Sequence, residues 1–345
     1  SQPIPALLRG FSAPVKCDYD YTDVQLKTLL AHEKDPFVAW QSGQALMTDA
    51  ILNTYQSLLA GEKTAVDDAL SSIFISLLGR QDVEPYFCAD LLTMPSLSYL
   101  CEQISDIHVA ELCDAKQAWM SHVAENVYGD FASTYDRLMA NPAPYAPTFD
   151  QMAQRRLSNH CLQMMAYTQK EEALALCESH YANADNLTDK VAALQAVNVM
   201  PSESRDRLLS QFYDDAQAHG LMLDRWFALQ ACCPHESTLT QVDKLIEHDS
   251  FVFSNPNRIR SVLGTFARNL PVLHHASGQG YTWLVAQTLK VDANNPQVAA
   301  RLVEPMIHWK RFSGKSQEAM RGQLELMLSS TLSKDVYELV SKALQ

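Results

Sequence analysis

From about residue 20 to the end of the sequence, apolar residues recur at the three- and four-residue spacing of amphipathic helices. Many of these stretches begin with side chains that cap helix starts. The predicted start signals are Thr22 with Gln25, Asp35 before Pro36, Thr64, Thr148 with Gln151, and Thr168 with Glu171. The same pattern predicts helices near 83–91, 95–104, 108–127, 129–139, 188–199, 203–218, 222–233, 238–248, 315–329 and 333–344. In total we expect roughly 16 to 18 helices joined mostly by short turns.

Short connections between amphipathic helices place consecutive helices side by side and antiparallel. A long series of such pairs predicts an all-α fold, an irregular right-handed superhelical stack similar to a HEAT or armadillo solenoid. The sequence contains no strict repeat, so we expect an irregular array. The concave face of such a stack is where other chains tend to bind.

Two proline-rich stretches interrupt the helical pattern. Residues 1–16 contain Pro3, Pro5 and Pro14 and are predicted to be extended, as the last strand of a preceding domain or a connector leaving one. The stretch NPAPYAP at 141–147 either divides the helices into two lobes or is a long loop inside one lobe. Since the sequence begins Ser1-Gln2 without Met, we expect the native chain to continue upstream.

Composition favours a folded soluble protein whose main partner is neither nucleic acid nor an anionic membrane. Apolar residues make up 47 % of the chain and charged residues 19 %. A net charge of −13 without any Lys/Arg run argues against nucleic acid or an anionic membrane as the main partner. No apolar segment approaches the roughly 18–20 residues of a membrane span. The eight cysteines form no C-x-x-C pair, which is typical of reduced, buried thiols in a cytoplasmic protein.

The motifs of common catalytic centres are absent from the sequence. It contains no H-E-x-x-H, no phosphate-binding loop, no G-x-S-x-G and no G-x-G-x-x-G. Cys232, Cys233 and His235 lie close together, but a zinc site would need a fourth ligand, and adjacent thiols point in different directions. We therefore predict no catalytic residue, no metal ligand and no cofactor within this sequence.

Two helices open in the same unusual way, in the stretches SNPNRIRSVLGTFAR at 254–268 and NNPQVAARLVEPMIHWKR at 294–311. In each, an asparagine can cap the helix and a proline takes the first helical position, where a missing N–H costs nothing. The pairs are Asn255 with Pro256 and Asn295 with Pro296.

Arginines follow these helix starts, where the helix dipole disfavours positive charge by roughly 0.3–1 kcal/mol. Arg258 and Arg260 lie in the first turns of one helix, and Gln297 and Arg301 in those of the other. Either each arginine pairs with a carboxylate on a neighbouring helix, or both helix starts face one cleft that binds an anionic or carbonyl-rich ligand.

Several segments resemble the C-terminal part of bacterial aminopeptidase N, a family of gluzincin-type zinc metallopeptidases. They are LLRGFSAPV at 7–15, NLTDKVAAL at 186–194, GLMLDRWFALQA at 220–231, SNPNRIRSVLGTFA at 254–267, NPQVAARLVEP at 295–305 and DVYELVSKAL at 335–344. The resemblance implies that residues 1–16 end a β-sandwich domain and that residues 17–345 form the helical C-terminal domain. It also implies that the zinc, its ligands and the catalytic residues lie in a part of the protein outside this sequence.

The function implied by the resemblance is that of a cavity wall in a zinc-dependent aminopeptidase of the membrane alanyl aminopeptidase type. In the family, the helical domain covers the catalytic domain and admits short peptides. The resemblance places Arg258, Gln297 and Arg301 at positions that line this cavity, and so implies that they are substrate-binding residues. We expect the same polypeptide's catalytic domain and short peptides as partners, and we expect this chain alone to be inactive. The alternative is a free-standing helical-repeat scaffold that binds a protein on its concave face.

Overall fold

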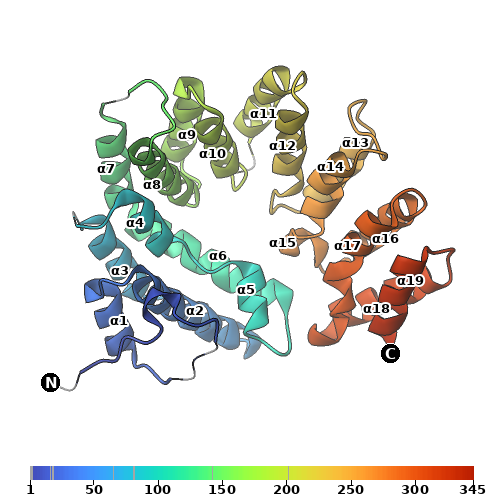
Figure 1. The fold of residues 1–345 in the computed structure, drawn as a ribbon, viewed down its shortest axis with the longest axis horizontal. Helices are drawn as coiled ribbons and strands as arrows, with labels where there is room; N and C mark the ends of the chain where they lie inside the picture. Colours follow the sequence, from blue (N-terminus) through green and yellow to red (C-terminus); the bar gives the residue numbers. More distant parts are fainter. Residues whose placement is uncertain are drawn as a thin grey trace. The chain divides into compact units, whose positions relative to one another are not determined.

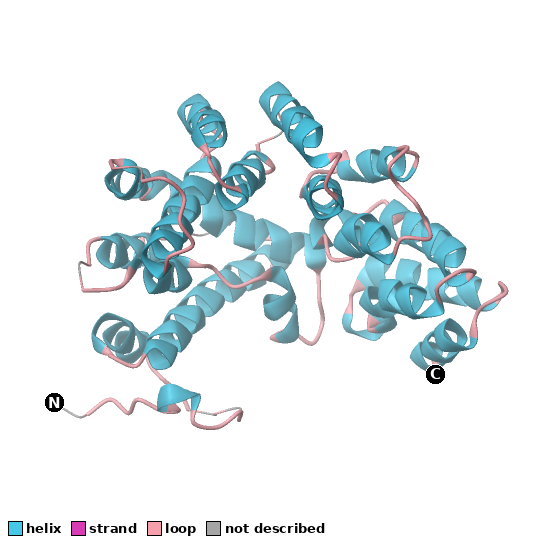
Figure 2. Cartoon of the chain, turned by 45° about the horizontal axis from the view of Figure 1, so that its top comes forward, coloured by secondary structure: helices cyan, strands magenta, loops and turns pink. Residues whose placement is uncertain are grey.

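The computed structural model describes residues 3–15, 17, 19–64, 66–80, 82–141, 143–200 and 202–345. Within them it contains nineteen α-helices and no β-strand (Figure 2). The extended pairing in this part of the chain is a single parallel bridge between Ile107 and Phe312. The predicted all-α class is therefore confirmed.

The chain divides into two compact units. Unit 1 contains Ser1–Leu100 and Asp114–Ala196, and unit 2 contains Cys101–Cys113 and Val197–Gln345. The proline-rich stretch 141–147 joins two helices inside unit 1, and Pro142 lies outside the described residues. The boundary predicted between residues 16 and 17 stays a prediction.

Unit 1 is made of helix pairs that pack as sequence neighbours, such as α1 on α2, α7 on α8 and α8 on α9. Large apolar side chains without solvent exposure fill the unit, among them Ile51, Tyr55, Phe74 and Phe131. Its helices are α1 (Asp23–His32), α2 (Pro36–Leu59), α3 (Ala69–Leu78), α4 (Pro85–Leu92), α5 (Leu97–Glu102), α6 (Val109–Asn126), α7 (Tyr128–Met139), α8 (Phe149–Ala166), α9 (Glu171–Asn183) and α10 (Leu187–Val197) (Figure 1). Helices α5, α6 and α10 each contain a unit boundary.

Unit 2 follows the same plan, with α11 on α12, α16 on α17 and α18 on α19. Phe212, Phe227, Phe266 and Tyr281 are the largest fully buried side chains of its core. Its elements are α11 (Glu203–Ala216), α12 (Gly220–Ala231), α13 (Thr238–Ile246), α14 (Pro256–Ile259), the π-helix η2 (Arg260–Gly264), α15 (Leu270–Leu273), α16 (Gln279–Asp292), α17 (Pro296–Ile307), the 3₁₀ turn η3 (Trp309–Arg311), α18 (Gly314–Leu328) and α19 (Lys334–Leu344).

An arginine fixes the segment Cys101–Cys113 in unit 2. The Nη2 atom of Arg311 donates to the carbonyl oxygens of Cys101 at 2.6 Å and Ile104 at 3.0 Å. The backbone N–H of Ile107 donates to the carbonyl of Arg311 at 2.8 Å, and Ser313 N–H donates back to the carbonyl of Ile107 at 3.1 Å. Backbone hydrogen bonds between residues more than two hundred positions apart thus join this segment to the stretch 311–313.

Three of the helix caps predicted in the first half of the chain form. Asp35 accepts a hydrogen bond from Val38 N–H at 3.1 Å, with Pro36 in the first turn of α2. Thr22 accepts a hydrogen bond from Gln25 N–H while the Gln25 side chain accepts from Thr22 N–H, the reciprocal capping box. Thr148 accepts from Gln151 N–H, but the Gln151 side chain accepts instead from Ala146 N–H at 2.7 Å. The Gln151 carboxamide therefore orders the loop before α8 and does not close the box.

Two other predicted helix starts were wrong because the turns before those helices are longer than expected. The helix predicted after Thr64 begins at Ala69, whose N–H donates to the Asp67 carboxylate at 2.9 Å. Thr168 does not cap α9, since its hydroxyl donates to the Met165 carbonyl at 2.7 Å and α9 begins at Glu171.

The N-terminal segment is less extended than its prolines predicted. A 3₁₀ turn, η1 (Arg9–Phe11), interrupts it. Arg9 pairs with Glu33 at 2.8 Å, and Gly10 N–H donates to Asp35 at 2.7 Å, so the turn packs on the start of α2. Among the described residues of 1–16 there is no strand.

Candidate functional site

The first asparagine-proline helix begins as predicted and then changes its winding. Asn255 accepts hydrogen bonds from Asn257 N–H at 3.0 Å and Arg258 N–H at 3.3 Å, with Pro256 in the first turn. After one α-turn the backbone becomes the π-helix η2. Such π-turns are rare and often occur at functional sites, and the sequence pattern did not reveal this one.

Arg258 points into the interior of unit 2. The residue is 6 % exposed, its Nη1 lies 3.0 Å from Asp224 Oδ1 on α12, and its guanidinium lies 4.9 Å from the Phe227 ring centre. The charges are at ion-pair distance without the alignment of a hydrogen bond. Arg258 Nε and Nη1 and Asp224 Oδ1 are therefore buried without a hydrogen-bond partner in the described part of the chain. The pairing with a carboxylate on a neighbouring helix, one of the two predicted alternatives, is what the structure contains.

Arg260 differs from Arg258 in being exposed. Its Nη1 donates to the Asn257 side chain at 3.3 Å, and no carboxylate of the described residues lies at ion-pair distance. A Cβ added at Gly264 would lie 3.7 Å from the Arg260 Cβ and 3.9 Å from Arg268 Nη2, so these arginines flank one bare stretch of helix. The sequence placed Arg258 and Arg260 at the same helix start but could not show which of the two is exposed to solvent.

The second asparagine-proline helix, α17, presents the other two predicted residues to solvent. Asn295 caps it by accepting from Val298 N–H at 3.2 Å. Val298, Leu302 and other apolar residues bury one face of α17, while Gln297 and Arg301 are exposed one turn apart. Neither side chain has a hydrogen bond or an ion pair within the described residues.

The second asparagine-proline helix contacts the π-helix that follows the first, but the structure does not join the predicted side chains. Helix α17 packs on η2, the segment that follows Arg258. No hydrogen bond or ion pair connects Arg258, Gln297 and Arg301 in the described part of the chain. Arg260, Gln297 and Arg301 are each exposed and Arg258 is buried, and the binding role of the predicted residues stays a prediction.

Neither a metal centre nor a membrane span is found in the described residues. No three His, Cys, Asp or Glu side chains there form a group that could hold a metal ion. Cys233 is buried, whereas His235 is exposed and pairs with Ser237 Oγ at 2.8 Å. In the same residues, no helix combines the length and the apolar character needed to cross a bilayer.

The stacked pairs of helices define a protein of the ARM-repeat class. The family model described as "Domain of unknown function (DUF3458_C) ARM repeats" matches residues 23–345, and the chain belongs to this family. The chain is 36 % identical over its whole length to the aminopeptidase N of Haemophilus influenzae and 35 % identical over 99 % of its length to that of Escherichia coli. These matches confirm the resemblance to aminopeptidase N.

A solved structure has the same fold over the whole chain. The crystal structure of Legionella pneumophila aminopeptidase A in complex with aspartic acid matches with a TM-score of 0.89 and 25 % identity. Our chain covers 41 % of that structure and 39 % of each of the two curated relatives. It therefore spans about two fifths of the length of the proteins it resembles.

Proposed function

We propose that this chain is the helical C-terminal domain of a cytoplasmic zinc aminopeptidase that removes N-terminal residues from peptides. The single observation that carries the proposal is the similarity of the whole chain to aminopeptidase N. The reaction needs a water activated by zinc. We place the zinc and its ligands in the remaining three fifths of such a polypeptide, which this sequence does not include.

Within that enzyme, the domain walls the cavity around the catalytic centre. A cavity closed by a stack of helices admits short peptides and excludes folded proteins. The partner is then the catalytic domain of the same polypeptide, and the substrates are short peptides. A solenoid suits this role because stacked helix pairs provide an extended wall without needing a catalytic group of their own.

Arg301 and Gln297 are proposed to contact the peptide, and their exposure and lack of protein partners support this. The guanidinium of Arg301 can bind the C-terminal carboxylate or a carbonyl of a peptide whose amino end lies at the zinc. The Gln297 carboxamide, one turn earlier, can pair with a peptide bond. We add Arg260 to this surface, because its charge is exposed and not neutralised.

Arg258 is proposed to contribute indirectly. Since Asp224 neutralises its charge, the guanidinium adds little long-range attraction for an anionic substrate. Its contribution would be to fix the start of α14 and so the direction of Arg260. A direct contact with substrate would require Arg258 to leave Asp224.

The first experiment tests whether peptide hydrolysis requires the part of the polypeptide outside this chain. The chain alone, supplied with zinc and an aminoacyl-chromophore substrate, should release no product. The longer polypeptide that contains the chain should hydrolyse the substrate and lose activity on zinc chelation. Hydrolysis by the chain alone, or an inactive longer polypeptide, would contradict the proposal and favour the scaffold alternative.

The second experiment tests the substrate contacts in the longer polypeptide. Arg301→Ala should lower kcat/KM by about tenfold for tri- and tetrapeptides, the loss expected for one charge-assisted hydrogen bond. A small aminoacyl-chromophore, which does not reach the arginine, should be hydrolysed as before. Arg321→Ala is the matched control, because Arg321 is an exposed arginine on α18 already paired with Glu325 at 2.9 Å. Equal values for both variants on all substrates would remove Arg301 from the substrate site.

A further inference from the structure

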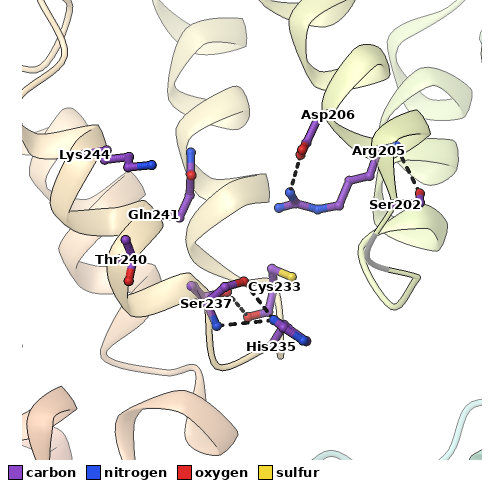
Figure 3. A pocket seen from close by; sticks show the side chains of 10 residues that line it. Ser202, Arg205, Asp206, Cys233, His235, Ser237, Thr240, Gln241 and Lys244 are labelled. Carbon is purple, nitrogen blue, oxygen red and sulfur yellow. Dashed lines mark hydrogen bonds and ion pairs between the residues drawn. The ribbon is translucent and has the colours of Figure 1, made fainter.

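Unit 2 contains a cavity of about 340 Å³ that the proposed function does not use. It is lined by residues from the start of α11, the loop before α13 and α13 itself, among them Ser202, Arg205, Thr240, Gln241 and Lys244 (Figure 3). Its volume lies near the lower end of the roughly 300–1,000 Å³ of small-molecule sites. The occupant would therefore be a small molecule.

Arg205 is held rigidly on one side of this cavity. Its side chain is 13 % exposed, and its Nε donates to the Asn198 side-chain oxygen at 2.9 Å. Asn198 is itself buried and donates to the Leu229 carbonyl at 2.6 Å. Nη1 lies 3.1 Å from Asp206, while Nη2 has no partner in the described part of the chain. A guanidinium fixed at Nε with a free Nη2 is a preorganised donor.

The opposite side of the cavity presents a second cation without a partner. Figure 3 shows the Lys244 ammonium and the Arg205 guanidinium pointing toward one another across the space. No carboxylate of the described residues pairs with Lys244. The Thr240 hydroxyl likewise has no hydrogen bond there, and the Gln241 carboxamide donates to Gln230 at 2.8 Å. The wall thus offers an ammonium, a guanidinium nitrogen and a hydroxyl.

The acidic group at the rim does not cancel these charges. Asp206 is the one carboxylate among the described lining residues, and its side chain is 78 % exposed. Solvent screens a pair this exposed, so Asp206 only partly neutralises Arg205. Two cations against one exposed carboxylate leave the cavity positive in a chain of net charge −13.

We propose that this cavity binds a small oxyanion, a phosphate or a carboxylate group, between Arg205 and Lys244. Arg205 Nη2 and Lys244 Nζ donate to separate oxygens of the bound group. The site is independent of the proposed peptidase function, because it shares no residue with Arg260, Gln297 and Arg301.

The proposal is tested by isothermal titration calorimetry of the 345-residue chain with inorganic phosphate and with glutarate, each at an ionic strength matched with sodium chloride. We expect saturable binding at one site for at least one of the two, and the lower Kd identifies the preferred group. No saturable binding of either up to about 10 mM, where a site of millimolar Kd would fill, overturns the proposal.

Variants locate the site. Lys244→Gln and Arg205→Gln should each weaken binding about tenfold or more, as for lost charge-assisted hydrogen bonds. Asp206→Asn should strengthen it several-fold because a competing charge is removed. Lys334→Gln, at an exposed lysine of α19 outside the cavity, makes the same change of charge and should leave the affinity unaltered. Because Lys244 is exposed, its variant should fold, and an affinity equal to that of Lys334→Gln would refute the site.

Discussion

Arg258 and Asp224 place opposite charges 3.0 Å apart inside unit 2, with side chains only 8 % and 18 % exposed. The pair joins α14 to α12, and the face of Phe227 covers the guanidinium at 4.9 Å. Removing two charges from water is costly, and here three of their polar atoms lack hydrogen bonds in the described part of the chain. Such a pair specifies the position of the helix start more than it stabilises the fold.

The Asp224→Asn variant should therefore be strongly destabilised. It leaves the Arg258 charge buried without a counter-charge, and the free energy of unfolding should fall by about 3 kcal/mol. Urea denaturation followed by circular dichroism measures the change. Glu325→Gln in the exposed Arg321–Glu325 pair is the control, with an expected change below about 1 kcal/mol. Similar losses in both variants would show that the buried pair carries no special penalty.

Two helical glycines should respond oppositely to replacement by alanine. A Cβ at Gly280 in α16 would lie 2.6 Å from the Leu273 carbonyl oxygen, so α16 and α15 approach too closely for any side chain. A Cβ at Gly322 in α18 would meet no atom within 4 Å. Gly280→Ala should lower the free energy of unfolding by about 1–3 kcal/mol through overpacking. Gly322→Ala should raise it by about 1 kcal/mol through helix propensity.

Thermal denaturation of both glycine variants measures these changes in one experiment. A stabilised Gly280→Ala variant would mean that α15 can shift away from α16 at little cost. A destabilised Gly322→Ala variant would mean that the position beside Gly322 does not tolerate a methyl group, although no atom lies within 4 Å of it.

Local signals in the sequence were sufficient to predict most helices and both asparagine-proline helix starts. Asn255 and Asn295 cap as predicted, because a cap depends on residues two or three positions away. The partner of Arg258 could not be predicted, since Asp224 lies 34 positions earlier and only the packing of α14 on α12 brings them together. Likewise, nothing local indicates the π-turn at η2.

The unit boundary shows the same limit at a larger scale. Prolines made 141–147 the clearest break in the pattern, yet the helices on either side of it pack together in unit 1. The segment Cys101–Cys113 belongs to unit 2 through the bonds of Arg311. Composition marks where helices end, whereas long-range hydrogen bonds decide which unit a segment joins.

Acid should destabilise the protein through buried histidines. Burial lowers the pKa of His274 to about 4, and its Nδ1 lies 2.8 Å from the Tyr281 hydroxyl while its ring stacks on Phe312. An unfolded histidine has a pKa of about 6.5. Between these values the unfolded chain binds the proton and the folded chain does not, so the free energy of unfolding falls as the pH decreases from about 6.5 to about 4. His160, whose pKa burial also lowers to about 4, should act in the same direction.

The measurement is the urea midpoint at several pH values between 7 and 4.5, compared with a His274→Gln variant. The variant should be less stable at pH 7, because Tyr281 and Phe312 lose the imidazole. On acidification, the free energy of unfolding of the variant should fall less steeply than that of the unmodified protein. The two slopes should differ by up to about 1.4 kcal/mol per pH unit, the contribution of one proton. Parallel pH profiles for the two proteins would exclude His274 as a source of the acid sensitivity.

Arg311 should control how firmly the segment Cys101–Cys113 is held in unit 2. Its Nη2 satisfies the carbonyls of Cys101 and Ile104, and the neighbouring backbone bonds of Ile107 depend on the same geometry. Arg311→Ala removes two charge-assisted hydrogen bonds, so local opening should become easier by about 1.5–3 kcal/mol. The amides of Ile107 and Ser313 should then exchange hydrogen about 10–100 times faster, as read by NMR or mass spectrometry. In an Arg321→Ala control these amides should keep their protection, and unchanged exchange in Arg311→Ala would mean that the backbone bridge alone holds the segment.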